Sequence, residues 1–202
     1  MKKSMISSVL SALFLIGCSG LALAHNHEGS DEVIHTTPQT NSLFNISDTW
    51  TTSQNKPFRL KELSGKPTVI TMVYTSCQMV CPVVVENVKK VEKSLPSNDE
   101  GKVNFAVFSF DPDRDTAEQL RTFAKEHKIE SPAWTLAYGN SAAVRKLAVA
   151  LGIKYKKNKS GDFEHDTIIT ILDGEGVIKY QQNALGKTTE GASLALKKML
   201  AQ

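Results

Sequence analysis

Several features that define protein classes are scarce in this sequence. It has only three cysteines in 202 residues, too few for a disulfide framework. With 41% hydrophobic and 22% charged residues, it resembles neither a disordered or collagen-like chain nor a membrane protein with many spans. The net charge of +3 falls to +1 without Lys2 and Lys3. Because nucleic-acid binding requires many phosphates to be neutralised, we expect no nucleic-acid partner.

The N-terminus has the composition of an export signal. Lys2 and Lys3 precede a mostly apolar stretch, Met5–Leu23, and Ala22–Ala24 has the small-x-small pattern of a secretory cleavage site. We therefore expect a signal peptide over residues 1–24. The rest of the chain would then be exported to the periplasm.

A lipoprotein signal over residues 1–17 is the alternative interpretation. The motif Leu15–Cys18 resembles a lipobox, and cleavage there would leave Cys18 as the lipid-anchored first residue. The apolar stretch continues after Cys18, which favours the longer signal peptide. An uncleaved anchor is less favoured because Gly17 and Gly20 interrupt the apolar span. In each case the body of the protein lies outside the cytoplasm.

The segment that follows is polar and contains histidine. Residues 25–42 have the composition of a flexible tether, and residues 43–202 are expected to form a single domain. If cleavage follows Ala24, a free amine, two amides and the third-position imidazole could bind square-planar Cu(II). This possible extra copper site involves His25 and His27; the alternative is a polar tail with chance histidines.

The hydrophobic pattern of the domain predicts an α/β fold. Continuous β-branched and aromatic runs indicate strands buried on both faces, and apolar residues at helical spacing separate these runs. The expected fold is a thioredoxin-like mixed sheet flanked by helices, with an N-terminal β-hairpin. The predicted strands are 44–50, 58–60, 67–74, 102–110, 133–137, 167–172 and 177–181, and the predicted helices are 79–95, 116–127, 141–151 and 191–201.

The motif Cys77-Gln78-Met79-Val80-Cys81-Pro82 lies where the first buried strand meets its helix. A helix N-terminus stabilises thiolates, and a pair of thiolates binds soft metals. On a regular helical turn the two Cβ atoms would be about 5–6 Å apart, whereas a disulfide requires about 3.5–4.5 Å. The spacing therefore favours a shared metal ion over a disulfide, which would need local unwinding. The sequence has no Cys-x-x-Cys-His motif for covalent haem.

A third metal ligand must come from elsewhere in the chain. His165 is the best candidate, in a predicted loop just before a strand that starts at Asp166. His127, near the end of a predicted helix, is expected to be solvated or to interact with the helix dipole. Two thiolates and one imidazole suit Cu(I) and could also accept Cu(II), whereas zinc usually takes a fourth ligand.

These segments resemble the Sco/SenC family, copper chaperones of cytochrome c oxidase assembly. Tyr74–Pro82 is similar to the family's (Phe/Tyr)-Thr-x-Cys-Pro-x-x-Cys-Pro signature, and Phe108–Thr116 to its Asp-Pro-x-x-Asp-Thr motif. His165 stands at the offset of the family's ligand histidine. The resemblance extends from Leu43 to Ala201.

The resemblance implies that Cys77, Cys81 and His165 are copper ligands. Asp111 ends the second core strand and would lie beside the site as a supporting group. Capping the next helix or starting a turn before proline is an equally good interpretation of Asp111.

Two positions depart from the family pattern. Gln78 replaces the proline usual after the first cysteine, and Asp166 follows the histidine where Ser or Thr is common. Asp166 could hydrogen-bond the ligand set or repel its negative charge. Arg114 and Asp115 are expected to form a turn salt bridge.

The resemblance implies a metallochaperone that delivers copper to the binuclear copper site of cytochrome c oxidase, with no catalytic turnover. Its partners would be the oxidase subunit that carries this centre and a copper donor or thiol reductant. The alternative function is a periplasmic thiol–disulfide oxidoreductase, in which Cys77 attacks and Cys81 resolves. Peroxide reduction is a weaker third possibility, because the motif lacks the usual single-nucleophile context.

Overall fold

The computed structural model describes residues 42–99, 101–186 and 188–201. The expected signal peptide, almost all of the expected tether, and Cys18, His25 and His27 lie outside these ranges. Within them, no helix is both long and apolar enough to cross a membrane.

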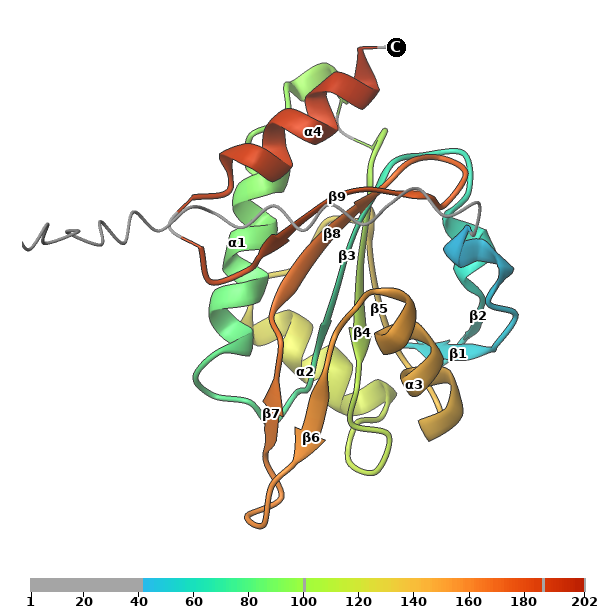
Figure 1. Ribbon diagram of the computed structural model, residues 1–202, viewed down its shortest axis with the longest axis vertical. Coiled ribbons are helices and arrows are strands. Elements are labelled where there is room, and N and C mark those ends of the chain that lie inside the picture. The colour runs from blue at the N-terminus through green and yellow to red at the C-terminus, as the bar shows by residue number, and fades with distance from the viewer. Residues whose placement is uncertain (1–41, 100, 187, 202) are drawn as a thin grey trace, which may run out of the picture.

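A seven-stranded mixed sheet forms the centre of the domain, with strand order β2-β1-β5-β4-β3-β8-β9 (Figure 1). The central strands β3, β4 and β5 are parallel, and the strands outside them pair antiparallel. All six side chains of β3 are buried, as the continuous apolar run predicts. The strands are β1 Trp50–Thr52, β2 Pro57–Phe58, β3 Thr68–Val73, β4 Asn104–Ser109, β5 Trp134–Tyr138, β8 Ile168–Leu172 and β9 Ile178–Asn183.

Helices cover both faces of this sheet (Figure 1). In that view α2 lies behind the sheet and α3 in front of it, while α1 and α4 pack side by side. The helices are α1 Cys81–Lys93, α2 Ala117–Glu126, α3 Ser141–Ala150 and α4 Glu190–Leu200. All four lie within about two residues of the predicted ranges, and the expected fold class is confirmed.

The N-terminal hairpin exists, but its strands are displaced from the predicted ones. Phe44 and Asn45, expected in a strand, lie in a short 3₁₀ helix, Leu43–Asn45, in which the Ser42 side chain accepts a hydrogen bond from the Phe44 N–H. A second 3₁₀ helix, Leu60–Leu63, follows β2. Local side-chain bonds thus override the strand preference of these apolar residues.

A second hairpin was missed in the sequence. Strands β6 (Tyr155–Lys157) and β7 (Phe163–His165) form a separate two-stranded sheet that extends beyond the main one (Figure 1). Its turn depends on Asn158, whose side-chain oxygen accepts hydrogen bonds from Ser160 and Asp162. The prediction that His165 lies in a loop is therefore wrong, since it is the last residue of β7.

Candidate metal centre

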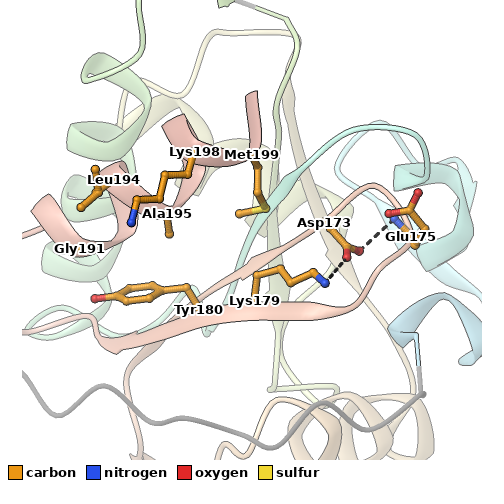
Figure 2. Close-up of a pocket in the computed structure, with 9 residues that line it drawn as sticks. All are labelled: Asp173, Glu175, Lys179, Tyr180, Gly191, Leu194, Ala195, Lys198 and Met199. Atoms are coloured by element: carbon orange, nitrogen blue, oxygen red, sulfur yellow. Dashed lines mark hydrogen bonds and ion pairs between the residues drawn. The ribbon is translucent and has the colours of Figure 1, made fainter. Parts of the chain in front are cut away.

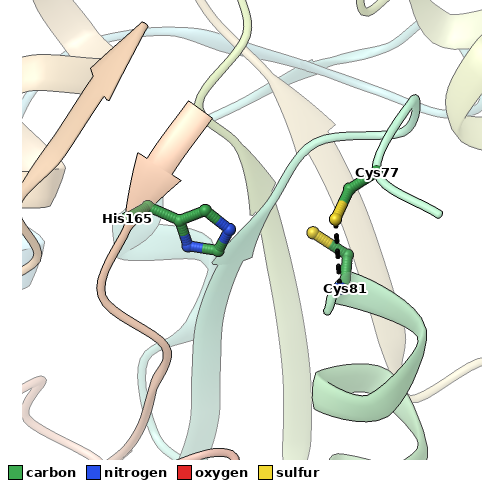
Figure 3. Close-up of side chains that lie close together, drawn as sticks. All are labelled: Cys77, Cys81 and His165. Atoms are coloured by element: carbon green, nitrogen blue, oxygen red, sulfur yellow. Dashed lines mark hydrogen bonds between the residues drawn. The ribbon is translucent and has the colours of Figure 1, made fainter. Parts of the chain in front are cut away.

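Two thiols and an imidazole meet at the carboxyl end of β3. Cys81 is the first residue of α1, Cys77 lies in the preceding loop, and His165 reaches toward both from β7 (Figure 3). Their ligand atoms all lie within 4.8 Å of one another. Both cysteines are free thiols and are buried, while His165 is partly exposed. This arrangement could hold one ion between three protein ligands.

The spacing argument assumed that both cysteines lie on one regular helical turn, but they do not. The helix begins only at Cys81, with Val80 as its N-cap, and the loop brings Cys77 over the helix N-terminus. There the Cys81 N–H points at the Cys77 sulfur, with 3.3 Å between nitrogen and sulfur. The loop conformation, rather than the helical repeat, therefore sets the separation of the two sulfurs.

The environment makes the two thiols chemically different. Hydrogen bonds to Cys77, first from the Cys81 side chain and then from the backbone N–H groups of residues 79–81, lower the pKa of Cys77 to about 4. The interaction with Cys77 and burial both raise the pKa of Cys81. The reduced, metal-free pair is thus a thiolate at Cys77 hydrogen-bonded by a thiol at Cys81.

The ring orientation of His165 follows from one hydrogen bond. Its Nδ1 lies 2.9 Å from the backbone carbonyl oxygen of Asp166. A carbonyl oxygen can only accept, so Nδ1 carries the proton and the lone pair of Nε2 is left for a metal. The Asp166 side chain instead accepts a hydrogen bond from the Lys154 N–H. The carboxylate therefore hydrogen-bonds Lys154 rather than the ligand set, while its repulsion of the negative charge of the ligands stays a prediction.

Aromatic rings surround the imidazole. The His165 ring centroid lies 4.6 Å from that of Phe110 and 5.9 Å from that of Tyr74. Phe163 packs against both of these rings at 5.2 Å. Burial, followed by a hydrogen bond to Cys77, raises the pKa of Tyr74 to about 12. The aromatic wall thus stays uncharged at neutral pH and limits the motion of the imidazole.

Asp111 is not part of the ligand cluster. Its side chain is fully buried and accepts a hydrogen bond from the Arg114 side chain, while its backbone oxygen accepts one from the Asp115 N–H. Arg114 in turn lies over the rings of Tyr74 and Phe163, 5.7 Å from each centroid. Asp111 therefore organises the turn, and it reaches the aromatic wall through Arg114.

Asp115 has a role that the sequence analysis did not identify. It was expected in a turn salt bridge, yet Arg114 pairs with Asp111 instead. The buried Asp115 carboxylate accepts hydrogen bonds from Ser109 and from both the N–H and hydroxyl of Thr75. Burial raises the pKa of Asp115. Asp115 thus ties the end of β4 to the loop that carries the cysteines; its place in the Asp-Pro-x-x-Asp-Thr motif was the available signal.

His127 is not part of the candidate ligand cluster either. It is the C-cap residue that follows α2, and its ring packs on Phe123 with 4.3 Å between ring centroids. Burial lowers the pKa of His127, whereas a favourable interaction with the helix dipole would raise it. His127 is only half-buried and stays in contact with solvent, whereas its lowered pKa does not favour the interaction with the helix dipole.

The cluster of Cys77, Cys81 and His165 opens into a cavity of about 690 Å³. Cys77 and His165 lie on its wall, together with Met79, Glu164 and Leu185. The site is therefore accessible from one side, although Cys81 itself is fully buried.

A second cavity, of about 670 Å³, lies between β9 and α4 (Figure 2). Its lining combines Leu194 and Met199 with a 2.9 Å ion pair between Lys179 and Asp173. Asp173 also accepts hydrogen bonds within the β8–β9 turn. This cavity has no thiol or imidazole in its lining and is not a comparable metal site.

The fold and the cluster define a class of protein, a thioredoxin-like domain with two thiols and an imidazole around one point. The chain belongs to the SCO1/SenC family, whose sequence model matches residues 36–200. The resemblance of the cysteine and Asp-Pro motifs is thereby confirmed.

Individual relatives agree with this assignment. A SCO1/SenC family lipoprotein of Bacillus anthracis is 25% identical with a TM-score of 0.70, covering 84% of this chain and 98% of its own. ScoI of Bradyrhizobium japonicum, solved with copper bound, is 29% identical with a TM-score of 0.63, covering 75% and 96%. A Stutzerimonas stutzeri protein named for copper binding is 22% identical, and the match spans 62% of each chain. BsSco, described as a member of the Sco family of cytochrome c oxidase assembly proteins, shares the fold at 19% identity, with a TM-score of 0.70 and coverage of 83% and 98%.

Proposed function

We propose that this chain binds one copper ion through Cys77, Cys81 and His165 and delivers it to the binuclear copper site of cytochrome c oxidase during assembly. The observation that carries the proposal is the convergence of three ligand atoms within 4.8 Å. Two soft sulfurs and one imidazole match the preferences of Cu(I), and the same set can accept Cu(II). The copper-bound relative supports the choice of metal.

The geometry suits transfer rather than permanent storage. Copper binding would release the proton of Cys81, whose pKa is raised in the metal-free pair. The open cavity beside Cys77 and His165 would then let a partner's ligand approach the ion. Stepwise exchange of thiolates, through intermediates in which both proteins hold the ion, would move it without a change in its valence. The oxidase subunit is the acceptor in this proposal, and a separate donor supplies the copper.

The test is anaerobic copper reconstitution of the reduced chain, with metal counting and X-ray absorption spectroscopy. We expect one copper with two sulfur ligands and one nitrogen ligand. His165→Ala should remove the nitrogen signal and weaken Cu(II) binding strongly. His127→Ala is the matched control, because His127 lies at the C-terminal end of α2 outside the cluster, and it should leave binding unchanged. Full Cu(II) affinity in His165→Ala would contradict the proposal.

A thiol–disulfide oxidoreductase remains the second candidate, because Cys77 is a thiolate at a helix N-terminus. Cys77 would attack a partner disulfide and release one partner thiolate. Cys81 would then resolve the mixed disulfide and release the other, so two electrons pass from the pair to the partner. His165 has no part in this exchange. Reductase activity that survives His165→Ala but not Cys77→Ser, together with unchanged copper affinity, would favour this function.

We also propose that the chain is exported and that residues 25–27 add a Cu(II) site at the mature N-terminus. A lipid anchor on Cys18 is the alternative mode of export, and a Bacillus anthracis relative is described as a lipoprotein. Mass spectrometry of the mature N-terminus distinguishes the two. Cu(II) titration of a chain that starts at Glu28 tests the extra site: we expect one equivalent fewer, and unchanged stoichiometry would refute it.

A further inference from the structure

Met79 is unusually placed for a methionine. Among the residues that the structure describes it is the most exposed large hydrophobic side chain, at 81%. It lies in the loop between Cys77 and Cys81 and lines the same cavity as Cys77 and His165. An exposed apolar side chain is not informative in itself. Here, however, the side chain carries a third sulfur atom beside two thiols.

We propose that the Met79 thioether is an auxiliary Cu(I) ligand at the mouth of the cavity, taking the place of His165 while the ion arrives or leaves. This inference rests on the proposed copper site and adds a path for the ion to that site. The step is a ligand exchange: a copper–sulfur bond forms as the copper–nitrogen bond breaks, with no electron transfer.

The loop geometry brings Met79 within reach of the ion. Its backbone N–H is one of the groups that hydrogen-bond the Cys77 sulfur, so the main chain at this position adjoins one of the two proposed sulfur ligands. Residues 78–80 belong to no helix or strand. The methionine side chain is unbranched and has three rotatable bonds, so the thioether can turn from solvent toward the cavity by rotamer changes.

Cys81 and His165 are less suited than Met79 to make the first contact with an arriving copper ion or the last contact with a departing one. Cys81 is fully buried, and His165 is confined by Phe110 and Tyr74 and by its hydrogen bond to Asp166. Met79 is the sulfur-bearing side chain of this cavity that faces solvent.

The chemistry of the thioether also fits Cu(I) rather than Cu(II). Thioethers are soft ligands that select Cu(I), whereas imidazole binds both valences. A thioether is neutral, so it adds no charge to a site that already has two thiolates. Met79 would therefore support Cu(I) in transit, and His165 would complete the site for either valence.

Anaerobic competition with a chromophoric Cu(I) chelator tests whether Met79 can bind. The comparison is His165→Ala with and without Met79→Leu, which keeps the size of the side chain and removes its sulfur. In the His165→Ala background we expect Met79→Leu to lower Cu(I) affinity about tenfold and to reduce the sulfur ligands from three to two. With His165 present, Met79→Leu should slow Cu(I) release to the chelator and leave equilibrium affinity within about threefold. Met199→Leu, on α4, is the control and should change neither quantity.

Equal Cu(I) affinities and equal sulfur numbers in the two His165→Ala proteins would overturn the role of Met79 and leave the proposed copper site intact. A failure of the unsubstituted chain to bind Cu(I) through sulfur would overturn both.

Discussion

At the scale of single residues, the two cysteines differ in exposure and in proton affinity. Cys77 is 9% exposed and lines the cavity, whereas Cys81 is inaccessible. The lowered pKa of Cys77 and the raised pKa of Cys81 have the same origin, because the Cys81 side chain and the helix N-terminus stabilise charge on Cys77. The two cysteines of the motif are the same residue type, but only Cys77 is a nucleophile in the reduced, metal-free protein.

This asymmetry predicts selective alkylation of the reduced, metal-free protein. Cys77 should react with iodoacetamide much faster than Cys81 at pH 7, since only the thiolate attacks. With a pKa of about 4, the thiolate fraction of Cys77 stays high down to about pH 5, so the rate should fall only below that value. Peptide mapping by mass spectrometry over a pH series measures both. Preferential labelling of Cys81 would contradict the assignment.

A second prediction at this scale concerns His127. Burial lowers its pKa in the folded state, so the unfolded chain binds this proton more readily. The contribution of neutral His127 to stability is present above the unfolded pKa of about 6.5 and is lost as the pH falls below it. Urea unfolding at pH 7.5 and pH 5.5 should show a smaller loss of stability for His127→Gln than for the unsubstituted chain. An equal loss would show that His127 does not contribute.

At the scale of elements, the site depends on a loop and a hairpin that meet above the end of β3. The loop supplies Cys77 and leads into Cys81 at the start of α1, and Asp115 holds this loop through hydrogen bonds from Thr75. The β6–β7 hairpin supplies His165, and Asp166 closes its base with two hydrogen bonds to Lys154. Each ligand is thus positioned by contacts outside its own sequence motif.

The hairpin turn offers a matched pair of substitutions. Gly161 and Gly101 both have left-handed backbone conformations, with φ of +88° and +80°, and open space where a Cβ would lie. Alanine at either position should cost about 1–2 kcal/mol of unfolding free energy. Only Gly161→Ala should also weaken copper binding, because Gly101 precedes β4 at the opposite end of the sheet. Calorimetry and copper titration check the two effects, and equal copper affinities would show that the turn does not position His165.

At the scale of the whole molecule, the proposed copper ion would link two parts of the fold that are far apart in sequence. Cys77 and Cys81 belong to the β3–α1 connection, and His165 belongs to the hairpin between α3 and β8. An ion bound by all three adds a constraint that the unfolded chain lacks.

Copper should therefore raise the thermal stability of the reduced chain. At a free copper concentration about 1,000 times the Kd, linkage gives a stabilisation of about 4 kcal/mol. Scanning calorimetry of the reduced protein, with copper and after chelation, measures this shift. His165→Ala should reduce it, whereas His127→Ala should not. An unchanged unfolding temperature with copper would contradict binding by the folded domain.

Local sequence patterns determined the secondary structure of this protein and indicated its family. The buried strands and the amphipathic helices follow from apolar periodicity, which acts over a few residues and is visible without a structure. The cysteine spacing and the Asp-Pro motif indicated the family, because the residue types that soft metals require are few and their order is distinctive. Even the candidate role of His165 followed from these motifs.

Tertiary structure alone decided how the site is assembled. The strands of the β6–β7 hairpin have only three residues each, too few to show a hydrophobic pattern, and side-chain hydrogen bonds of Asn158 and Asp166 stabilise the hairpin. The separation of Cys77 from the helix, the burial of Asp115 beneath Thr75 and the aromatic wall around His165 depend on contacts between segments 40 to 90 residues apart. A one-dimensional pattern does not encode such distances, because they arise only when the whole sheet brings its strand ends together.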